Sequence, residues 1–254
     1  MSPGKARVFF LGTSGSTFTE DNIPPCIYVE GYLFDCPAAC PQKLKMYGLL
    51  DSLHTILLSH THIDHSLGIY ELAWHLGTTQ ANKKVTLYLP ASEQAHVEQT
   101  FRILGKNFAD KLLSFVNIIG VDSGLQSNGI TVVAAKHSVP ALGYRLDLNG
   151  TSICYTGDTA PSREMSEAFK DCKLLIHDSS YPPGEEEKAA LDGHSTPIQA
   201  AEIAKESGAR MLALVHLPYA RLGRTIDGEF LKAARKIFPN TIVPKPGDAI
   251  DLVE

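Results

Sequence analysis

Residues 60–65 read His-Thr-His-Ile-Asp-His, so three imidazoles and one carboxylate fall within six residues, directly after the apolar run 56–58. Neutral imidazole and ionised carboxylate are the ligands that divalent zinc, manganese and iron take in proteins. In an extended segment His60 and His62 project to the same side, because side chains alternate along the chain. Asp64 and His65 come where the chain is expected to turn into a helix, and they can point at a second position nearby. One short segment can therefore supply ligands to two metal ions.

The composition is that of an ordinary globular protein, with 44% hydrophobic and 20% charged residues in a chain of 254. No apolar run approaches the ~20 residues that span a bilayer, and residues 1–7 contain no apolar core of a secretory signal. We therefore expect a cytoplasmic protein with no membrane partner. No Pro/Gly-rich linker, low-complexity tract or repeat interrupts the chain, which predicts a single domain over residues 1–254.

The five cysteines are too few, and odd in number, for a disulfide framework. Cys36 and Cys40 are the only close pair, and no second Cys/His pair completes a structural zinc site with them. We therefore expect reduced, mostly buried thiols.

The net charge of −5 limits the contact that the chain can make with nucleic acid. A protein that grips a long stretch of nucleic acid usually carries a basic stripe, and this sequence has no dense Lys/Arg run. Bound metal ions can neutralise phosphate locally, so a nucleic-acid substrate is still allowed. The net charge argues only against an extended contact with nucleic acid.

Helices and strands are expected to alternate in both halves of the chain, with frequent hairpins. Helices are predicted over residues 39–49, 66–77, 91–104, 162–170 and 225–238, and a capping box at 196–199 opens another that reaches residue 207. Strands are predicted over residues 7–11, 54–58, 85–89, 130–135, 142–148, 152–155, 174–177, 211–215 and 249–253, with a hairpin over 26–35 and an Asn149-Gly150 turn. The pattern favours an α/β fold, an αββα sandwich of two mixed β-sheets flanked by helices.

Three further candidate ligands, His137, Asp158 and His216, each follow a predicted strand. Functional side chains concentrate on loops that a rigid scaffold positions. Taken alone, each has an ordinary structural explanation, such as a histidine at a strand end or an aspartate that caps a helix.

Together with the His-x-His-x-Asp-His signature, these residues resemble the ligand set of the metallo-β-lactamase-fold hydrolases. The resemblance implies two divalent metal ions, zinc in the first place and manganese or iron as alternatives. It implies seven ligands: His60, His62 and His137 on one ion, Asp64, His65 and His216 on the second, and Asp158 bridging both.

The second half is similar to the ribonuclease Z branch and its phosphodiesterase relatives. The similarity lies in Tyr-Thr-Gly-Asp-Thr-Ala-Pro at 155–161, Leu-Leu-Ile-His-Asp-Ser-Ser at 174–180, Gly-His-Ser-Thr at 193–196 and Leu-Val-His at 214–216. In that branch an acidic residue pairs with the histidine of His-Ser-Thr, which here implies Asp178 and His194. The carboxylate would orient the imidazole and keep it protonated as a proton donor. The alternative is that His194 merely precedes a helix.

The chain departs from that branch in three places. Asp178 stands where glutamate is usual, and the shorter side chain is expected to lengthen the contact with His194. Arg221 is shifted by one position, which leaves its phosphate-binding role open, together with the role of Tyr219. Only 20 residues separate His137 from Asp158, so the basic arm that holds tRNA is expected to be absent.

The sequence thus predicts a dinuclear-metal-dependent phosphodiester hydrolase, similar to ribonuclease Z, in which Asp64 also orients the attacking water and accepts its proton. The substrate would be short RNA, an RNA 3′ end, or a cyclic or small nucleotide, and a homodimer is left open. A thioester or lactone hydrolase of the same fold is the alternative. A non-catalytic or nucleic-acid-binding protein is a third hypothesis.

Residues 12–16 resemble the family's first loop, which lies near the substrate phosphate. Ser179, Ser180 and Cys154 show no nucleophile–base pattern.

Overall fold

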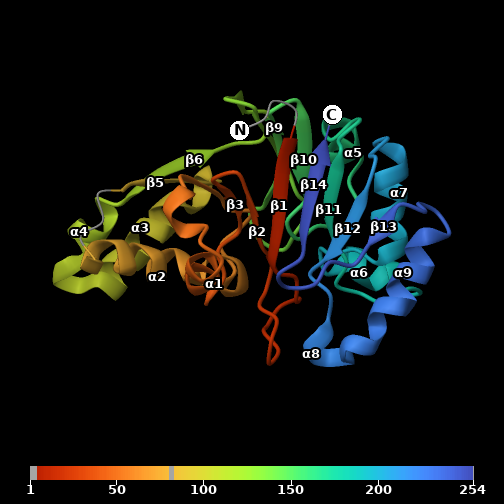
Figure 1. Ribbon diagram of the computed structural model, residues 1–254, viewed down its shortest axis with the longest axis horizontal. Coiled ribbons are helices and arrows are strands. Elements are labelled where there is room, and N and C mark those ends of the chain that lie inside the picture. Colours follow the sequence, from red (N-terminus) through yellow and green to blue (C-terminus); the bar gives the residue numbers. More distant parts are fainter. Residues whose placement is uncertain (1–4, 80–82, 254) are drawn as a thin grey trace.

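The computed structural model describes residues 5–79 and 83–253 as two seven-stranded sheets with helices on their outer faces (Figure 1). Residues 1–4, part of the segment inspected for a secretory signal, lie outside the described residues, as do 80–82 and 254. The predicted αββα sandwich of two mixed sheets is confirmed. Within the described residues we find no helix with the length and apolarity needed to cross a membrane.

The first sheet is antiparallel at one side and parallel at the other, where β3, β4, β5 and β6 run in the same direction. In spatial order its strands are β14 (Ala249–Val253), β1 (Lys5–Gly12), β2 (Cys26–Val29), β3 (Tyr32–Phe34), β4 (Thr55–Leu57), β5 (Val85–Pro90) and β6 (Val116–Val121). Its helices are α1 (Cys40–Met46), α2 (Ile63–Thr79), α3 (Gln94–Gly105) and α4 (Ala109–Leu113), with short 3₁₀ turns at Leu50–Ser52, Ala91–Glu93 and Lys106–Phe108.

The second sheet is also mixed, with β10 to β13 parallel and β7 to β10 antiparallel. In spatial order its strands are β13 (Thr241–Ile242), β12 (Leu212–Val215), β11 (Leu174–Asp178), β10 (Thr151–Tyr155), β9 (Leu142–Leu148), β8 (Ile130–Ala134) and β7 (Gln126–Ser127). Its helices are α5 (Arg163–Ala168), α6 (Glu186–Leu191), α7 (Pro197–Glu206), α8 (Tyr219–Leu222) and α9 (Asp227–Arg235), with a 3₁₀ turn at Arg224–Ile226.

The core consists of three apolar layers, one between the sheets and one beneath the helices on each side. Strand β10 shows why: Ile153 and Tyr155 enter the central layer, while Cys154 points to the layer under α5 and α7. Side chains alternate along a strand, so a strand covered on both faces can place consecutive apolar residues in two different layers. The polar residues that follow such strands are thereby placed at the ends of the sandwich.

The local signals in the second half are confirmed in detail. Asn149 and Gly150 both have left-handed backbone angles, φ 51° and 76°, as a two-residue hairpin turn requires. Helix α7 begins with the expected capping box, in which the side chains of Thr196 and Gln199 each accept from the other's backbone N–H. Helix α2 begins at Ile63, earlier than expected, so Asp64 and His65 belong to its first turn.

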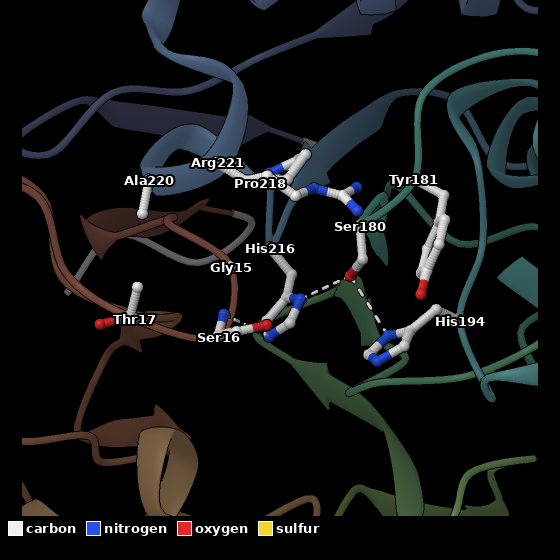
Figure 2. A pocket seen from close by; sticks show the side chains of 10 residues that line it. All are labelled: Gly15, Ser16, Thr17, Ser180, Tyr181, His194, His216, Pro218, Ala220 and Arg221. Atoms are coloured by element: carbon white, nitrogen blue, oxygen red, sulfur yellow. Dashed lines mark hydrogen bonds between the residues drawn. The ribbon is translucent and has the colours of Figure 1, made fainter.

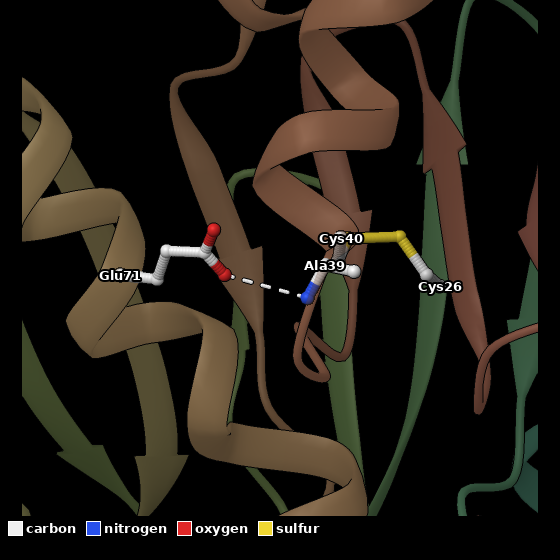
Figure 3. The surroundings of a disulfide bond; sticks show 4 residues. All are labelled: Cys26, Ala39, Cys40 and Glu71. Carbon is white, nitrogen blue, oxygen red and sulfur yellow. Dashed lines mark hydrogen bonds between the residues drawn. A yellow bond between two sulfur atoms is a disulfide. The ribbon is translucent and has the colours of Figure 1, made fainter. Parts of the chain in front are cut away.

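The expectation of reduced thiols is wrong for one pair, because Cys26 and Cys40 form a disulfide (Figure 3). The bond joins the start of β2 to the start of α1, with Cα atoms 6.2 Å apart. Cys36 and Cys40 are the closest pair in the sequence, but the fold places the more distant Cys26 next to Cys40. The three other cysteines are free and buried, as expected: Cys36, Cys154 and Cys172.

Candidate functional site

All seven candidate ligands converge at one end of the sandwich, although they come from four separate segments. His60 and His62 lie on the loop after β4, and Asp64 and His65 lie in the first turn of α2. The remaining three follow strands of the second sheet: His137 after β8, Asp158 after β10 and His216 after β12. The site therefore lies where the two sheets meet, and each sheet supplies part of it.

The first group consists of His60, His62 and His137. His62 Nδ1 lies 3.0 Å from His60 Nε2 and 3.2 Å from His137 Nε2. Around a tetrahedral zinc ion with Zn–N bonds of ~2.0–2.1 Å, neighbouring nitrogens lie about 3.3 Å apart. Both distances are close to that spacing, and one ligand atom from each of the three residues lies within 4.8 Å of the other two.

The second group consists of Asp64, His65 and His216. Asp64 Oδ2 lies 3.4 Å from both His65 Nε2 and His216 Nε2. Asp158 Oδ2 lies 3.3 Å from each of the same two nitrogens, and 3.8 Å from His60 Nε2 of the first group. Asp158 thus occupies the position between the groups that a bridging ligand needs, and its bridging role stays a prediction.

Two buried polar atoms at the centre of the site, His65 Nε2 and Asp158 Oδ1, have no hydrogen-bond partner among the residues that the structure describes. Leaving such atoms unpaired in a protein interior is costly, and a bound cation would satisfy both. Burial, helped by the nearby His65, lowers the pKa of His60 well below its ordinary value. Burial alone would raise the pKa of Asp158, but His216 and His65 outweigh it and hold that pKa well below its ordinary value. Neutral imidazole and ionised carboxylate are the forms that divalent metals bind.

The buried carboxylate of Asp35 supports this site, and the sequence analysis missed it. Asp35 Oδ1 accepts from the Ser59 N–H (2.7 Å), while Oδ2 accepts from the Ser59 hydroxyl (2.8 Å) and the Tyr155 hydroxyl (2.6 Å). The same Oδ2 lies 2.7 Å from His65 Nδ1, which donates its proton. That bond fixes the ring so that Nε2 faces the other ligands, the usual arrangement behind a metal-bound histidine.

Two other ligands are oriented in the same way. His137 Nδ1 lies 2.9 Å from the carbonyl oxygen of Gly193, whose φ of 77° favours glycine and where a Cβ would come within 2.9 Å of the His137 Cα. His216 Nδ1 lies 2.5 Å from the hydroxyl of Ser180, which in turn donates to Asp178. The sequence shows no nucleophile–base pattern for Ser180, and it gives no sign of this positioning role, which depends on the tertiary contact with His216.

The structure brings Asp178 and His194 together beside the metal ligands. His194 Nδ1 lies 2.9 Å from Asp178 Oδ2, which is an ordinary hydrogen-bond distance despite the shorter aspartate side chain. Asp178 is fully buried at the end of β11, where the Thr159 N–H also donates to Oδ2 (3.2 Å). Burial by itself would lower the pKa of His194, but the Asp178 carboxylate outweighs it and raises that pKa to about 9.

A polar cleft of about 240 Å³ opens beside these residues (Figure 2). His194 and His216 line it, together with Tyr181 and Arg221, whose guanidinium carbon lies 5.4 Å from the Tyr181 ring centroid. The first loop also lines the cleft through Gly15, where a Cβ would come within 2.5 Å of the His216 carbonyl oxygen. Tyr219, in contrast, is buried and donates its hydroxyl to Asp227 (2.8 Å), so it belongs to the packing of α8.

Residues 32–217 of this chain match a family whose description is "Beta-lactamase superfamily domain". The ribonuclease Z of Methanosarcina mazei is 29% identical over 98% of this chain and 97% of its own length. That alignment spans 306 positions, more than this chain has residues, so the relative contains residues with no counterpart here.

Two solved structures share the fold. The metallo-beta-lactamase fold protein YhfI from Bacillus subtilis is similar with a TM-score of 0.82 at 23% identity, covering 97% of this chain and 99% of that one. Human tRNase Z, short form, is similar with a TM-score of 0.75 at 20% identity, covering 96% of this chain and 98% of that one.

Replacing Asp35 by Asn should weaken metal binding about 10- to 100-fold, the usual effect of removing a group that orients a metal ligand. The amide keeps one acceptor oxygen and turns a donor towards Ser59, Tyr155 or His65. Competition with a zinc chelator measures the affinity, and circular dichroism checks the fold.

Asp122→Asn, at an exposed position, is the matched control and should bind zinc like the parent. Tyr155→Phe removes one donor to Asp35 and should have a smaller effect. A folded Asp35→Asn variant with unchanged zinc affinity would show that Asp35 does not orient the ligand.

Proposed function

The chain belongs to the beta-lactamase superfamily, and from that premise we propose that it is a dinuclear-metal-dependent phosphodiester hydrolase similar to ribonuclease Z. The observation that carries the proposal is the Asp178–His194 pair, which lies in a cleft directly beside two groups of metal-binding side chains. Hydrolysis of a phosphodiester releases an alkoxide, and a protonated imidazole can supply the proton that this leaving group needs. Relatives over nearly the whole chain are ribonucleases Z, which supports the same assignment.

We propose that both ions are zinc, because the six-residue run and the later histidines make a nitrogen-rich donor set with near-tetrahedral spacing. Divalent ions held by these seven residues would supply Lewis-acid polarisation of the phosphoryl oxygen and a lower pKa, near 7, for the attacking water. His60, His62 and His137 would hold one ion, Asp64, His65 and His216 the other, and Asp158 would bridge them.

The remaining chemistry falls to side chains of this chain. Asp64 would orient the water and accept one of its protons as the new P–O bond forms. His194 would donate a proton to the departing oxygen as the other P–O bond breaks. Asp178 would hold His194 in place and Ser180 would hold His216, so both act through the residues they position.

The substrate we propose is small: short RNA, an RNA 3′ end, or a cyclic or small nucleotide. Residues between His137 and Asp158 form only the β9–β10 hairpin and its flanking turns, which leaves no room for a tRNA-binding arm. A thioester or lactone hydrolase would use the same metal groups but gives the Asp178–His194 pair no evident task. A single domain over residues 1–254, a cytoplasmic location and a homodimer stay proposals.

Reconstituted protein should contain close to two metal ions per chain. Asp158→Ala should weaken both sites, since Oδ2 lies near nitrogens of both groups, while His137→Ala should affect mainly one. Elemental analysis after gel filtration gives the ratio, with Asp122→Ala as the matched exposed control. A ratio near one that Asp158→Ala leaves unchanged would refute the bridge.

His194→Ala should keep its metal yet lose turnover by about 10²- to 10⁴-fold on a substrate with a poor leaving group, the range of general acid–base groups. On bis-p-nitrophenyl phosphate the loss should shrink, because p-nitrophenolate departs with little protonation. The exposed His96→Ala serves as the control. Equal losses on both kinds of substrate would exclude the proton-donor role.

The dependence of kcat/KM on salt should be shallow, because we expect contact with only one or two phosphates. Each phosphate contact contributes a slope of about −0.7 to −0.9 in the logarithm of affinity against that of salt. The measurement compares kcat/KM for a precursor tRNA and a dinucleotide across a salt series. A strong, salt-sensitive preference for the precursor would show that tRNA is gripped without the arm.

A further inference from the structure

A second cleft, of about 450 Å³, adjoins the metal ligands on the side away from His194. Its walls are the segment after β1, residues 37–39 and the start of α2, and Asp64 is the one charged residue among the described residues that line it. Ser16 and Thr17 line both clefts and separate them. In Figure 2 the Thr17 side chain lies on the opposite side of His216 from His194.

Large apolar side chains are exposed around this second cleft. Phe18 is 71% exposed, Ile63 69% and Leu67 38%. Ile63 and Leu67 lie four residues apart on α2, so their side chains are neighbours on the same face of the helix. A contiguous exposed apolar surface around a cleft of this size is typical of a ligand-binding site.

The proposed proton donor and the proposed proton acceptor line different clefts. Of these two clefts, the polar one is lined by His194, the proposed proton donor, and the apolar one by Asp64, the proposed proton acceptor. The leaving group must stand next to His194 to receive its proton, so its body occupies the polar cleft. The apolar cleft adjoins the site on the other side of His216, where it can accept the ester group that stays on phosphorus.

We propose that the apolar cleft binds the nucleobase of the nucleoside that stays esterified to phosphate after cleavage. This inference rests on the proposed function and narrows it to nucleoside phosphodiesters that yield a nucleotide monoester. Phe18 offers an exposed aromatic ring, and aromatic rings stack on the π-face of any base. The walls provide few hydrogen-bonding groups, so the cleft accepts different bases with little selectivity among them.

The test uses two diesters with the same leaving group, thymidine 5′-(p-nitrophenyl phosphate) and methyl p-nitrophenyl phosphate. The protein should prefer the thymidine ester, and Phe18→Ala should lower the ratio of the two kcat/KM values about tenfold, the scale of one base–aromatic stack. Ile63→Ser should lower the same ratio. Ile103→Ala removes an equally exposed apolar side chain on α3, away from the cleft, and should leave the ratio unchanged.

Calorimetric binding of thymidine 5′-phosphate and methyl phosphate to the metal-loaded protein separates this inference from the proposed function. Binding that prefers the nucleotide and weakens about tenfold in Phe18→Ala supports the nucleobase site, even if no diester is hydrolysed and the proposed function fails. Hydrolysis of both diesters with a ratio that Phe18→Ala does not change overturns the nucleobase site and leaves the proposed function standing. A preference for octyl p-nitrophenyl phosphate over the thymidine ester also overturns it, in favour of an alkyl chain.

Discussion

The geometry of the site depends on one buried carboxylate, that of Asp35. It accepts hydrogen bonds from both donors of Ser59, from Tyr155 and from His65, so it connects the loop after β4, a strand of the second sheet and the first turn of α2. A carboxylate in a protein interior is tolerated only when such donors surround it. The same bonds that satisfy Asp35 therefore set the distance between the two sheets at the point where the ligands meet.

Sequence reasoning succeeds where a signal is short in range. The run from His60 to His65 contains its own spacing, the turn at Asn149 and the capping box at Thr196 are local chemistry, and a histidine or aspartate after a strand is placed at the sheet end by the strand itself. These signals predict the sandwich, whereas the gathering of the seven candidate ligands is what the resemblance to the metallo-β-lactamase-fold hydrolases implies. Strand β6 is not predicted because Asn117 and Gly120 interrupt its apolar pattern. Strand β13 is not predicted because it has only two residues.

What the sequence does not reveal depends on tertiary placement. Asp35 follows the apolar strand β3 like any polar residue that ends a strand, and only the packed sheets bring Tyr155 and His65 to it. Ser180 can orient His216 only because the fold places its hydroxyl between Asp178 and His216. Cys26 meets Cys40 through the packing of α1 on the first sheet. His216 itself has φ 59°, a conformation that a non-glycine residue keeps only where its surroundings enforce it.

The division of the ligands between the sheets has a thermodynamic consequence. His60, His62, Asp64 and His65 belong to the first half of the chain, and His137, Asp158 and His216 to the second, so an ion bound among them cross-links the two halves. By mass action, a ligand that binds only the folded chain adds RT ln(1 + [L]/Kd) to its free energy of unfolding. The supply of free metal would thus govern the lifetime of the folded protein against proteolysis as well as its turnover.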